Sequence, residues 1–283
     1  MAKGNLLLGT AGNSVGDVVM YRREGAQVSR VRVRKIKNPK TDAQSLQRAA
    51  FSPVAKFFSP LAVVLERSFE GLSKMKSYNK FLKTNIDLAR ANGWLLPKGT
   101  GFFPLPYQLS KGTLPIVNLT LDNNSSGFAL PVNTQVTSIG DFSTAMIALG
   151  YKNGDVVTFI LVQSDSQSFA TANYTPIAVQ IELDTDSTVE MTTALAMVKF
   201  NSSQGPSGYA NTIGNADTAG AAVIIARFEN DKWRRSTQSL ELKPAVLTAI
   251  SSADYKAAAI ASYGMNAGDP NPLVYLDGDT LEG

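Results

Sequence analysis

The sequence predicts an α+β protein in which a basic N-terminal β-hairpin and a helical segment precede an antiparallel β-sandwich or barrel-like domain with a C-terminal helix. Three observations support this prediction. Valine and arginine alternate near the N-terminus, apolar residues recur at helical spacing between positions 46 and 89, and short apolar segments separated by turn residues fill positions 100–243. We expect two domains, residues 1–98 with the hairpin and helices, and residues 99–283 with the β-rich part, the C-terminal helix and a tail.

The first expected element is a hairpin. Its strands, Asp17–Arg23 and Gln27–Lys35, are rich in β-branched and aromatic residues and flank the turn residues Glu24 and Gly25. Because side chains alternate across a strand, the arginines of the second strand share one face and its valines share the other. The arginines expected on that face are Arg30, Arg32 and Arg34.

Amphipathic helices are expected next, because the apolar residues from position 46 to position 89 recur at spacings near three and four. Pro53 and Pro60 lie within this run, so we expect it to be kinked or divided into shorter helices. Ser77 is expected to cap a later helix that ends at Asn92.

The β-rich part is predicted from short apolar segments between turn residues. The segments expected to form strands are TSIGDFSTAMIALGY (137–151), DVVTFILVQ (155–163), IAVQIEL (177–183), ALAMVKF (194–200) and AAVIIARF (221–228). A closing hairpin is expected over Asn230 and Asp231. A helix is expected from Pro244 to Ser262.

The composition argues against an enzyme. The 283 residues include no cysteine and no histidine, which excludes disulfides, thiolate sites and every mechanism that uses imidazole. Two acidic pairs, Asp184 with Asp186 and Asp277 with Asp279, lack the ligand spacing of a calcium loop. We therefore expect no catalytic residue, no metal and no cofactor.

Targeting signals are not expected either. The N-terminus lacks the long apolar stretch of a secretory signal, and no window approaches the ~20 apolar residues of a membrane span. The glycosylation patterns at Asn118, Asn124 and Asn201 are therefore interpreted as accidental. We expect a protein that does not engage a membrane and that is kept in a cytoplasm or assembled into a particle there.

Positive charge is concentrated at the N-terminus. Residues 1–48 hold ten Lys or Arg and three acidic residues, a net charge of +7, whereas the whole chain carries +4 and residues 49–283 therefore carry −3. A segment with its own sign commonly has an anionic partner. The candidate nucleic-acid-binding residues of this segment are Arg22, Arg23, Arg30, Arg32, Arg34, Lys35, Lys37, Lys40 and Arg48.

The arginine row suits phosphate, because guanidinium donors match phosphate oxygens and residues two apart in a strand lie about 6.6 Å apart, close to the phosphate spacing of an extended strand. Two alternatives are an interface with protein and a solvated edge strand kept charged to prevent strand addition. Only Tyr21 is near enough to stack on bases, so backbone contact without sequence readout is expected. Trp233, Arg234 and Arg235 form a second cluster, in which Trp233 either extends the same surface or packs beside the hairpin turn.

The run GTAGNSVGDVVMYRREGAQVSRVRVRKIKNPKTDAQSLQRAAF, with SFEG at 68–71 and KWRRSTQSL at 232–240, resembles an uncharacterised domain family of Bacteroidetes bacteria, their phages and gut single-stranded DNA phages. The chain departs from the family at Asn13, where similar proteins usually have a basic residue. The resemblance implies a phage or mobile-element setting and brings no catalytic residues. It is carried by Gly16, Asp17, Tyr21, Arg30, Arg32, Asn38, Pro39, Thr41, Gln44, Gln47 and Arg48.

Together these expectations describe a non-enzymatic, phage-type DNA-binding protein that coats or condenses DNA, single-stranded DNA in particular, without sequence preference and forms a homo-oligomer. The alternative is a virion structural protein, of a capsid or tail, whose basic arm contacts the genome or neighbouring subunits. A third hypothesis is a carbohydrate-binding module in the β-rich domain. The expected location is the cytoplasm of a bacterial host or the virion.

Overall fold

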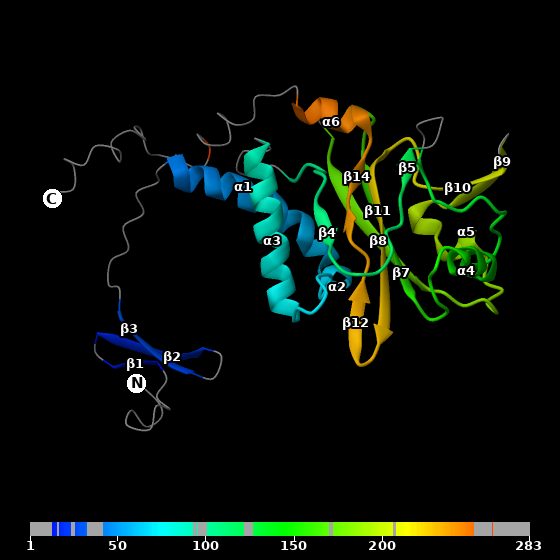
Figure 1. Ribbon diagram of the computed structural model, residues 1–283. Coiled ribbons are helices and arrows are strands. Elements are labelled where there is room, and N and C mark those ends of the chain that lie inside the picture. Colours follow the sequence, from blue (N-terminus) through cyan, green and yellow to red (C-terminus); the bar gives the residue numbers. More distant parts are fainter. Residues whose placement is uncertain are drawn as a thin grey trace. The chain divides into compact units, whose positions relative to one another are not determined.

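The computed structural model describes residues 13–15, 17–23, 26–32, 42–92, 95, 101–121, 127–169, 172–205, 208–251 and 262. The fold is α+β, with an N-terminal hairpin, helices, several antiparallel sheets and a C-terminal helix, as predicted, and the sheets are open (Figure 1). The chain forms two compact units. Unit 1 comprises Met1–Lys40 with Leu273–Gly283, and unit 2 comprises Thr41–Pro272.

Unit 1 contains a three-stranded antiparallel sheet in the order β1-β2-β3. Its strands are β1 (Asn13–Val15), β2 (Val18–Arg23) and β3 (Ala26–Val31). The pairing of β2 with β3 confirms the predicted hairpin, and β1 adds a short strand on the other side of β2. The predicted turn residues, Glu24 and Gly25, lie outside the described residues.

Helices open unit 2. They are α1 (Asp42–Phe58), the 3-10 turn η1 (Ser59–Leu61), α2 (Ala62–Leu65) and α3 (Lys74–Ala91). Pro53 lies inside α1, whereas Pro60 lies in η1, where the regular helix is interrupted. The predicted division of the run therefore occurs at Pro60, because a proline removes a backbone donor and is tolerated in a first turn.

The predicted start of α3 at Ser77 is wrong. The N-cap is Ser73, and Ser77 lies buried one turn inside the helix. The backbone N–H of Phe69 donates to the Ser77 hydroxyl oxygen at 3.1 Å, so this serine fixes the preceding loop instead of capping the helix. The end of the helix is as predicted, with Asn92 as its C-cap.

A five-stranded antiparallel sheet forms the centre of unit 2, in the order β12-β11-β7-β8 with β14 also paired to β11. Its strands are β7 (Val156–Ser164), β8 (Tyr174–Glu182), β11 (Thr218–Glu229), β12 (Lys232–Arg235) and β14 (Glu241–Leu242). Asn230 and Asp231 connect β11 to β12 with φ values of 53° and 56°, the left-handed conformation of a two-residue hairpin turn. The edge strand β8 carries Pro176 opposite Val162.

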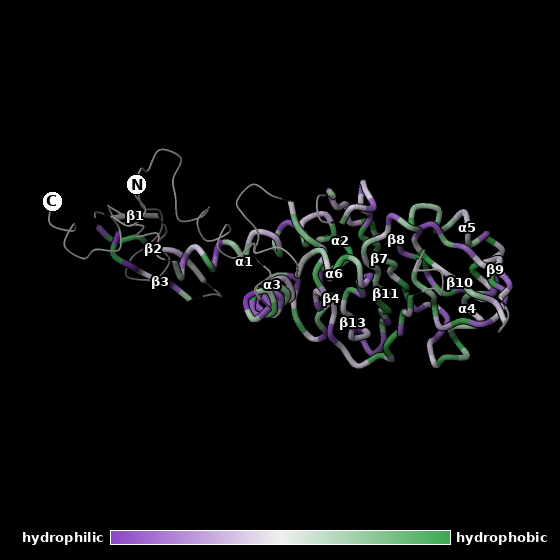
Figure 2. The backbone as a smooth tube through the Cα atoms, turned by 90° about the horizontal axis from the view of Figure 1, so that it is seen from above, coloured by the Kyte–Doolittle hydropathy of each residue, from purple (hydrophilic) through white to green (hydrophobic). Residues whose placement is uncertain are grey.

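The central sheet is buried on both faces. Ile160 and Val162 of β7 belong to the hydrophobic cluster that includes α1 and α3. Phe159 and Leu161, which alternate with them, belong to the cluster that includes α4 and α5. Because neighbouring side chains point to opposite faces, β7 separates two cores and is almost continuously apolar. Figure 1 shows the helices on either side of the sheet, and Figure 2 shows the hydrophobic strands between them.

Two segments predicted as strands are helical. The segment 137–151 contains α4 (Ile139–Ala148), and the segment 194–200 contains the end of α5 (Met191–Ala194) followed by the 3-10 turn η2 (Ala196–Val198). A capping box starts α4: the Asp141 N–H donates to the Ser138 hydroxyl at 3.1 Å, and the Ser138 N–H donates to the Asp141 carboxylate at 2.9 Å. This local signal outweighs the strand propensity of the short apolar run.

The smaller elements complete unit 2. A four-stranded sheet, in the order β5-β6-β10-β9, contains β5 (Thr120–Leu121), β6 (Phe128–Ala129), β9 (Asn201–Gly205) and β10 (Gly208–Ile213). A two-stranded sheet pairs β4 (Gln108–Ser110) with β13 (Gln238–Ser239). The predicted C-terminal helix is described as α6 (Pro244–Ser251), and residues 252–261 of that prediction lie outside the described residues.

One helical stretch, Ala43–Leu65, is long and apolar enough to cross a membrane by length and composition. The prediction that no window approaches a membrane span is therefore wrong by this measure, since the stretch contains only two charged residues, Arg48 and Lys56. Val54 and Phe57 within the stretch are fully buried in the hydrophobic cluster shared with α3 and the central sheet. The apolar residues of this stretch therefore pack in the core of unit 2.

Candidate nucleic-acid interface

The hairpin of unit 1 places the predicted arginines on a short antiparallel ribbon. Arg30 is paired with Val19, and the β2 residues Arg22 and Arg23 lie opposite Gln27 and Ala26. Arg32 follows β3 directly, and its backbone N–H donates to the Asp17 carbonyl oxygen. The extended pairing therefore continues to Arg32, which keeps Arg30 and Arg32 two residues apart on one strand.

Arg30 and Arg32 are exposed. The Arg30 guanidinium carbon lies 5.9 Å from the centroid of the Tyr21 ring, which is itself 40% exposed. A cation over an aromatic face at this distance gains about 0.5–1 kcal/mol at an exposed site. Within the described part of the chain, neither Arg30 nor Arg32 forms an ion pair with a carboxylate. Both charges are therefore presented to solvent.

The other predicted residues of the basic segment lie in different parts of the chain. Arg22 and Arg23 lie in β2, of which the structure describes the backbone at these two positions. Arg48 lies half-buried in α1, which belongs to unit 2. The other predicted residues, which lie outside the described residues, are Arg34, Lys35, Lys37 and Lys40.

The second predicted cluster lies at the end of the β11–β12 hairpin in unit 2. The Trp233 ring packs against Phe228, with 5.3 Å between ring centroids, and the Arg235 guanidinium carbon lies 4.9 Å from the Trp233 centroid. Arg235 is half-buried, and its Nε donates to the Arg67 carbonyl oxygen at 3.4 Å. Burial lowers the pKa of Arg235 from its usual value. These contacts are the ones expected if Trp233 packs beside the hairpin turn.

Carboxylates lie close to Arg234 and to two cations near this hairpin, Lys152 and Arg227. Glu229 receives Lys152 Nζ at 3.0 Å and Arg234 Nε at 3.6 Å. The hydrogen bond from Lys152 holds the pKa of the Glu229 carboxyl below its usual range. On the same strand, Arg227 makes two hydrogen bonds of 2.7 Å to the Asp155 carboxylate. The charge of Arg234 is therefore partly neutralised within the fold.

A pocket of about 480 Å³ lies beside this hairpin turn. It is lined by cations that include Arg67 and Lys232, and by the carboxylates of Glu70, Glu229 and Asp231. Arg67 has a φ of 60°, a left-handed conformation that is uncommon for a residue with a side chain of this size. Because the two signs of charge are interspersed, the pocket does not present a continuous cationic surface to a polyanion.

Sequence reasoning missed a third group of cations, the exposed lysines of α3. They are Lys76, Lys80 and Lys83. Their spacing of four and three residues is a helical-face signal that could have been found in the sequence. The signal is less conspicuous than the arginine row because residues 49–283 carry a net charge of −3 as a whole, which hides the positive excess of α3.

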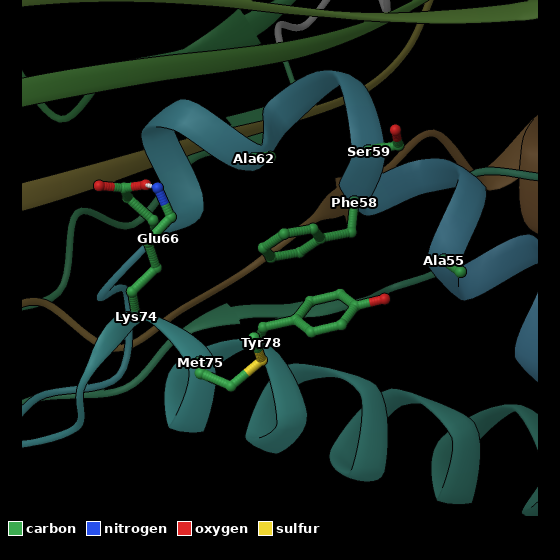
Figure 3. Close-up of a pocket in the computed structure, with 8 residues that line it drawn as sticks. All are labelled: Ala55, Phe58, Ser59, Ala62, Glu66, Lys74, Met75 and Tyr78. Atoms are coloured by element: carbon green, nitrogen blue, oxygen red, sulfur yellow. Dashed lines mark ion pairs between the residues drawn. The ribbon is translucent and has the colours of Figure 1, made fainter. Parts of the chain in front are cut away.

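An apolar pocket of about 400 Å³ lies between the end of α1, α2 and the start of α3. Figure 3 shows the rings of Phe58 and Tyr78 next to each other in its lining, with Met75 beside Tyr78. The two ring centroids are 4.8 Å apart. An ion pair between Lys74 and Glu66 lies at one end, and the Met75 side chain is 68% exposed.

Metal-binding candidates receive no support from the described geometry. In that part of the chain, no group of three or more acidic residues could hold a metal ion. The Asp186 N–H donates to the Asp184 carboxylate at 3.0 Å, which is the hydrogen bond of a turn. Asp277 and Asp279 lie outside the described residues, so the expectation that the protein holds no metal stays a prediction.

Comparison with known proteins gives one match. Residues 9–94 match the model of a family described as "Family of unknown function (DUF6266)", and this match covers less than a third of the chain. Neither a curated protein nor a solved structure matches. The matched segment runs from the start of the hairpin region to the end of α3, and so contains both Arg30 with Arg32 and the lysines of α3. The N-terminal part of this chain is thus similar to an uncharacterised family, as its sequence predicted.

Proposed function

We propose that this protein binds nucleic acid without catalysis and without sequence readout, as a phage-type protein that coats or condenses DNA. The hairpin of unit 1 makes the contact. The observation that carries the proposal is the exposed pair Arg30 and Arg32, which lie two residues apart on one strand with no carboxylate paired to them in the described residues.

The chemistry of this pair suits a phosphate backbone. Guanidinium groups two residues apart lie about 6.6 Å from each other along a strand and can each donate two hydrogen bonds to a phosphate. Tyr21 is 40% exposed and carries Arg30 over its ring, so the hairpin offers at most one platform for a base. Backbone contact dominates such an interface, and the release of condensed counterions makes its affinity steeply dependent on salt.

Fluorescence anisotropy of labelled single- and double-stranded DNA at 50 and 200 mM salt tests the proposal with the full chain. The Arg30→Ala/Arg32→Ala variant should bind more weakly and lower the slope of log affinity against log salt by about 1.5, the value for two lost phosphate contacts. The Arg30→Lys/Arg32→Lys variant keeps both charges and should keep the slope.

The matched control is Lys199→Ala/Lys232→Ala, which removes two exposed cations from unit 2. It should bind as the unmodified protein does. Absence of binding at 50 mM salt, or an equal loss of affinity in the control, would contradict the role of the hairpin.

The alternative proposal is a structural part of a virion, and the apolar pocket of unit 2 favours it. Met75 is 68% exposed and Val63 is 83% exposed, and Met75 borders the pocket formed with Phe58 and Tyr78. A second copy of this chain would cover such a surface. Analytical ultracentrifugation and electron microscopy of nuclease-treated protein should then show an oligomer or a closed particle, and Met75→Asp should dissociate it. A monomer at tens of micromolar would argue against this alternative.

A further inference from the structure

The outward face of α3, in unit 2, carries a row of lysines that is separate from the arginines of the unit 1 hairpin. Lys76, Lys80 and Lys83 are exposed and follow each other at intervals of four and three residues. At a rise of about 1.5 Å per residue, these intervals place successive lysines about 6 Å and 4.5 Å apart along the helix axis. Residues three and four apart are neighbours on a helix surface, so the three ammonium groups share one face.

The opposite face of α3 is fixed in the core, and this fixes the direction of the lysine row. The residues of α3 that are buried are Ser77, Phe81, Leu82, Asn85, Ile86 and Ala89. The side-chain amide of Asn85 donates to the Gln108 carbonyl at 3.1 Å and its oxygen accepts from the Gln108 N–H at 2.8 Å. These hydrogen bonds hold α3 against β4, so the lysine row points away from the core.

The row is not neutralised by its own helix. Asp87 and Arg90, one and two turns beyond Lys83, are paired with each other at 3.8 Å, and Lys74 is paired with Glu66. Among the described residues, Lys76, Lys80 and Lys83 have no carboxylate within ion-pair distance. Like charges three and four residues apart destabilise a helix, and a polyanion bound along the row would remove this repulsion.

Lys111 extends the cationic surface beside the helix. It is exposed, and it lines a surface depression together with Lys80. The one acid of that depression, Glu70, already accepts hydrogen bonds from the Thr113 N–H at 2.8 Å and the Arg235 N–H at 3.3 Å. The Glu70 carboxylate is therefore directed at backbone donors of its own unit.

The distribution of charge along the chain sets this face apart. Residues 41–272 hold 18 basic and 18 acidic residues, so unit 2 is neutral as a whole, yet the 18 residues of α3 include five cations and one acid. The family-matched segment, residues 9–94, holds 16 basic and 6 acidic residues, a net charge of +10, whereas the rest of the chain carries −6. The positive charge of the matched segment is thus shared between the hairpin and α3.

We propose that the face of α3 formed by Lys76, Lys80 and Lys83, with Lys111 beside it, is a second contact surface for the phosphate backbone of nucleic acid, located in unit 2. The inference rests on the proposed function for the class of ligand, but it assigns a separate site. An anionic membrane is the less suitable partner, because interfacial helices carry apolar residues that insert into the bilayer beside the cations. Asn79, between Lys76 and Lys80, is polar, and the residue that continues this face one turn beyond Lys83 is Asp87, which is paired with Arg90.

The test uses the full chain and the same anisotropy measurement. The Lys76→Gln/Lys80→Gln/Lys83→Gln variant removes the charges but keeps helix propensity, because lysine and glutamine are similar helix formers. If three phosphates are contacted, the salt slope should fall by about 2–3, and the loss of affinity between 50 and 200 mM salt should shrink roughly 20- to 40-fold. The triple Lys→Arg variant should behave as the unmodified protein.

The charge-matched control is Lys152→Gln/Lys199→Gln/Lys232→Gln, which removes three exposed lysines elsewhere in unit 2. Circular dichroism and thermal unfolding verify that each variant folds. If the α3 variant binds as this control does while Arg30→Ala/Arg32→Ala weakens binding, the second surface is wrong and the proposed function stands.

If the unmodified protein binds no DNA, the proposed function fails, and the second surface as a nucleic-acid site fails with it. Sedimentation with phosphatidylserine vesicles then distinguishes the membrane alternative, since vesicle binding lost in the α3 variant would overturn the assignment to nucleic acid. If the α3 variant alone weakens DNA binding, the second surface holds and the hairpin does not make the contact.

Discussion

Two hairpins of this protein look alike in sequence and differ in what surrounds their cations. The β2–β3 hairpin of unit 1 presents Arg30 and Arg32 to solvent, with Arg30 over the exposed Tyr21 ring. The β11–β12 hairpin of unit 2 also combines arginines with an aromatic residue, but Arg234 lies near Glu229 and Arg235 packs on Trp233. The comparison teaches that an arginine-rich hairpin indicates a partner only when no acid of the same fold faces it.

The largest effect should come from breaking the buried ion pair beneath the unit 2 hairpin. The Asp155 side chain is 1% exposed and that of Arg227 is 13% exposed. Asp155→Ala leaves a guanidinium without its partner in a mostly buried position, so we expect a loss of about 3–5 kcal/mol in the free energy of unfolding, measured by urea denaturation. Asp155→Ala/Arg227→Met should recover part of it, and a loss below 1 kcal/mol in the single variant would show that the pair contributes little.

A smaller effect should follow from Trp233→Ala, which removes the contacts to Phe228 and Arg235. Because the Trp233 side chain is 36% exposed, we expect a loss of about 1–2 kcal/mol, less than for a core aromatic residue. DNA affinity should change less than twofold if this tryptophan is a packing residue. A selective loss of DNA affinity with unchanged stability would instead make the two hairpins functionally equivalent.

Acid pH should weaken unit 2 through the carboxylate of Asp141, which starts α4. Hydrogen bonds from Thr137 and Ser138 lower the pKa of Asp141 to about 2. A carboxyl whose folded pKa is depressed adds stability that is fully present above its unfolded pKa, near 3.8, and is lost as pH falls through its folded pKa.

For this largely exposed group, screening reduces the contribution to about 1 kcal/mol. Asp141→Ala should therefore destabilise the protein at pH 7 by about that amount, partly through the lost cap of α4, and the difference from the unmodified protein should disappear between pH 4 and pH 2. Thermal unfolding across this range measures it. An unchanged difference at pH 2 would assign the effect to some property other than the carboxylate charge.

The smallest stability effect is expected where the largest binding effect is proposed. Arg30→Ala/Arg32→Ala should change the free energy of unfolding by no more than about 0.5 kcal/mol, because exposed side chains without ion-pair partners contribute little. Denaturation measured beside DNA binding makes the contrast with Asp155→Ala direct. A destabilisation above 1 kcal/mol would mean that the hairpin arginines support the fold, as those of unit 2 do.

Strong local signals made much of the fold predictable. The strands at 155–163 and 221–228 were found because they are β-branched and bounded by turn residues, and Asn230-Asp231 is a sequence that tolerates the left-handed turn observed. The apolar segments 137–151 and 194–200 were misassigned because a short apolar run fits a buried helix as well as a strand. In the first of these segments, the signal that distinguishes a helix is the capping box formed by Ser138 and Asp141, three residues apart.

The candidate site was predictable only in part. The alternation in the hairpin placed Arg30 and Arg32 on one strand with two-residue spacing, and they are exposed there. The acids that surround the cations near the β11–β12 hairpin could not be predicted, since partners such as Glu229 and Lys152 are 77 positions apart in the sequence. Which cations are neutralised depends on the pairing of strands that are distant in sequence.

The proline in the edge strand β8 has a consequence for contacts between molecules. Pro176 has no N–H to offer, so it interrupts the hydrogen-bonding pattern that a strand from a neighbouring molecule would need for docking there. Neighbouring molecules are thereby discouraged from joining their sheets at this edge into one continuous sheet. Any association at β8 is left to side-chain contacts.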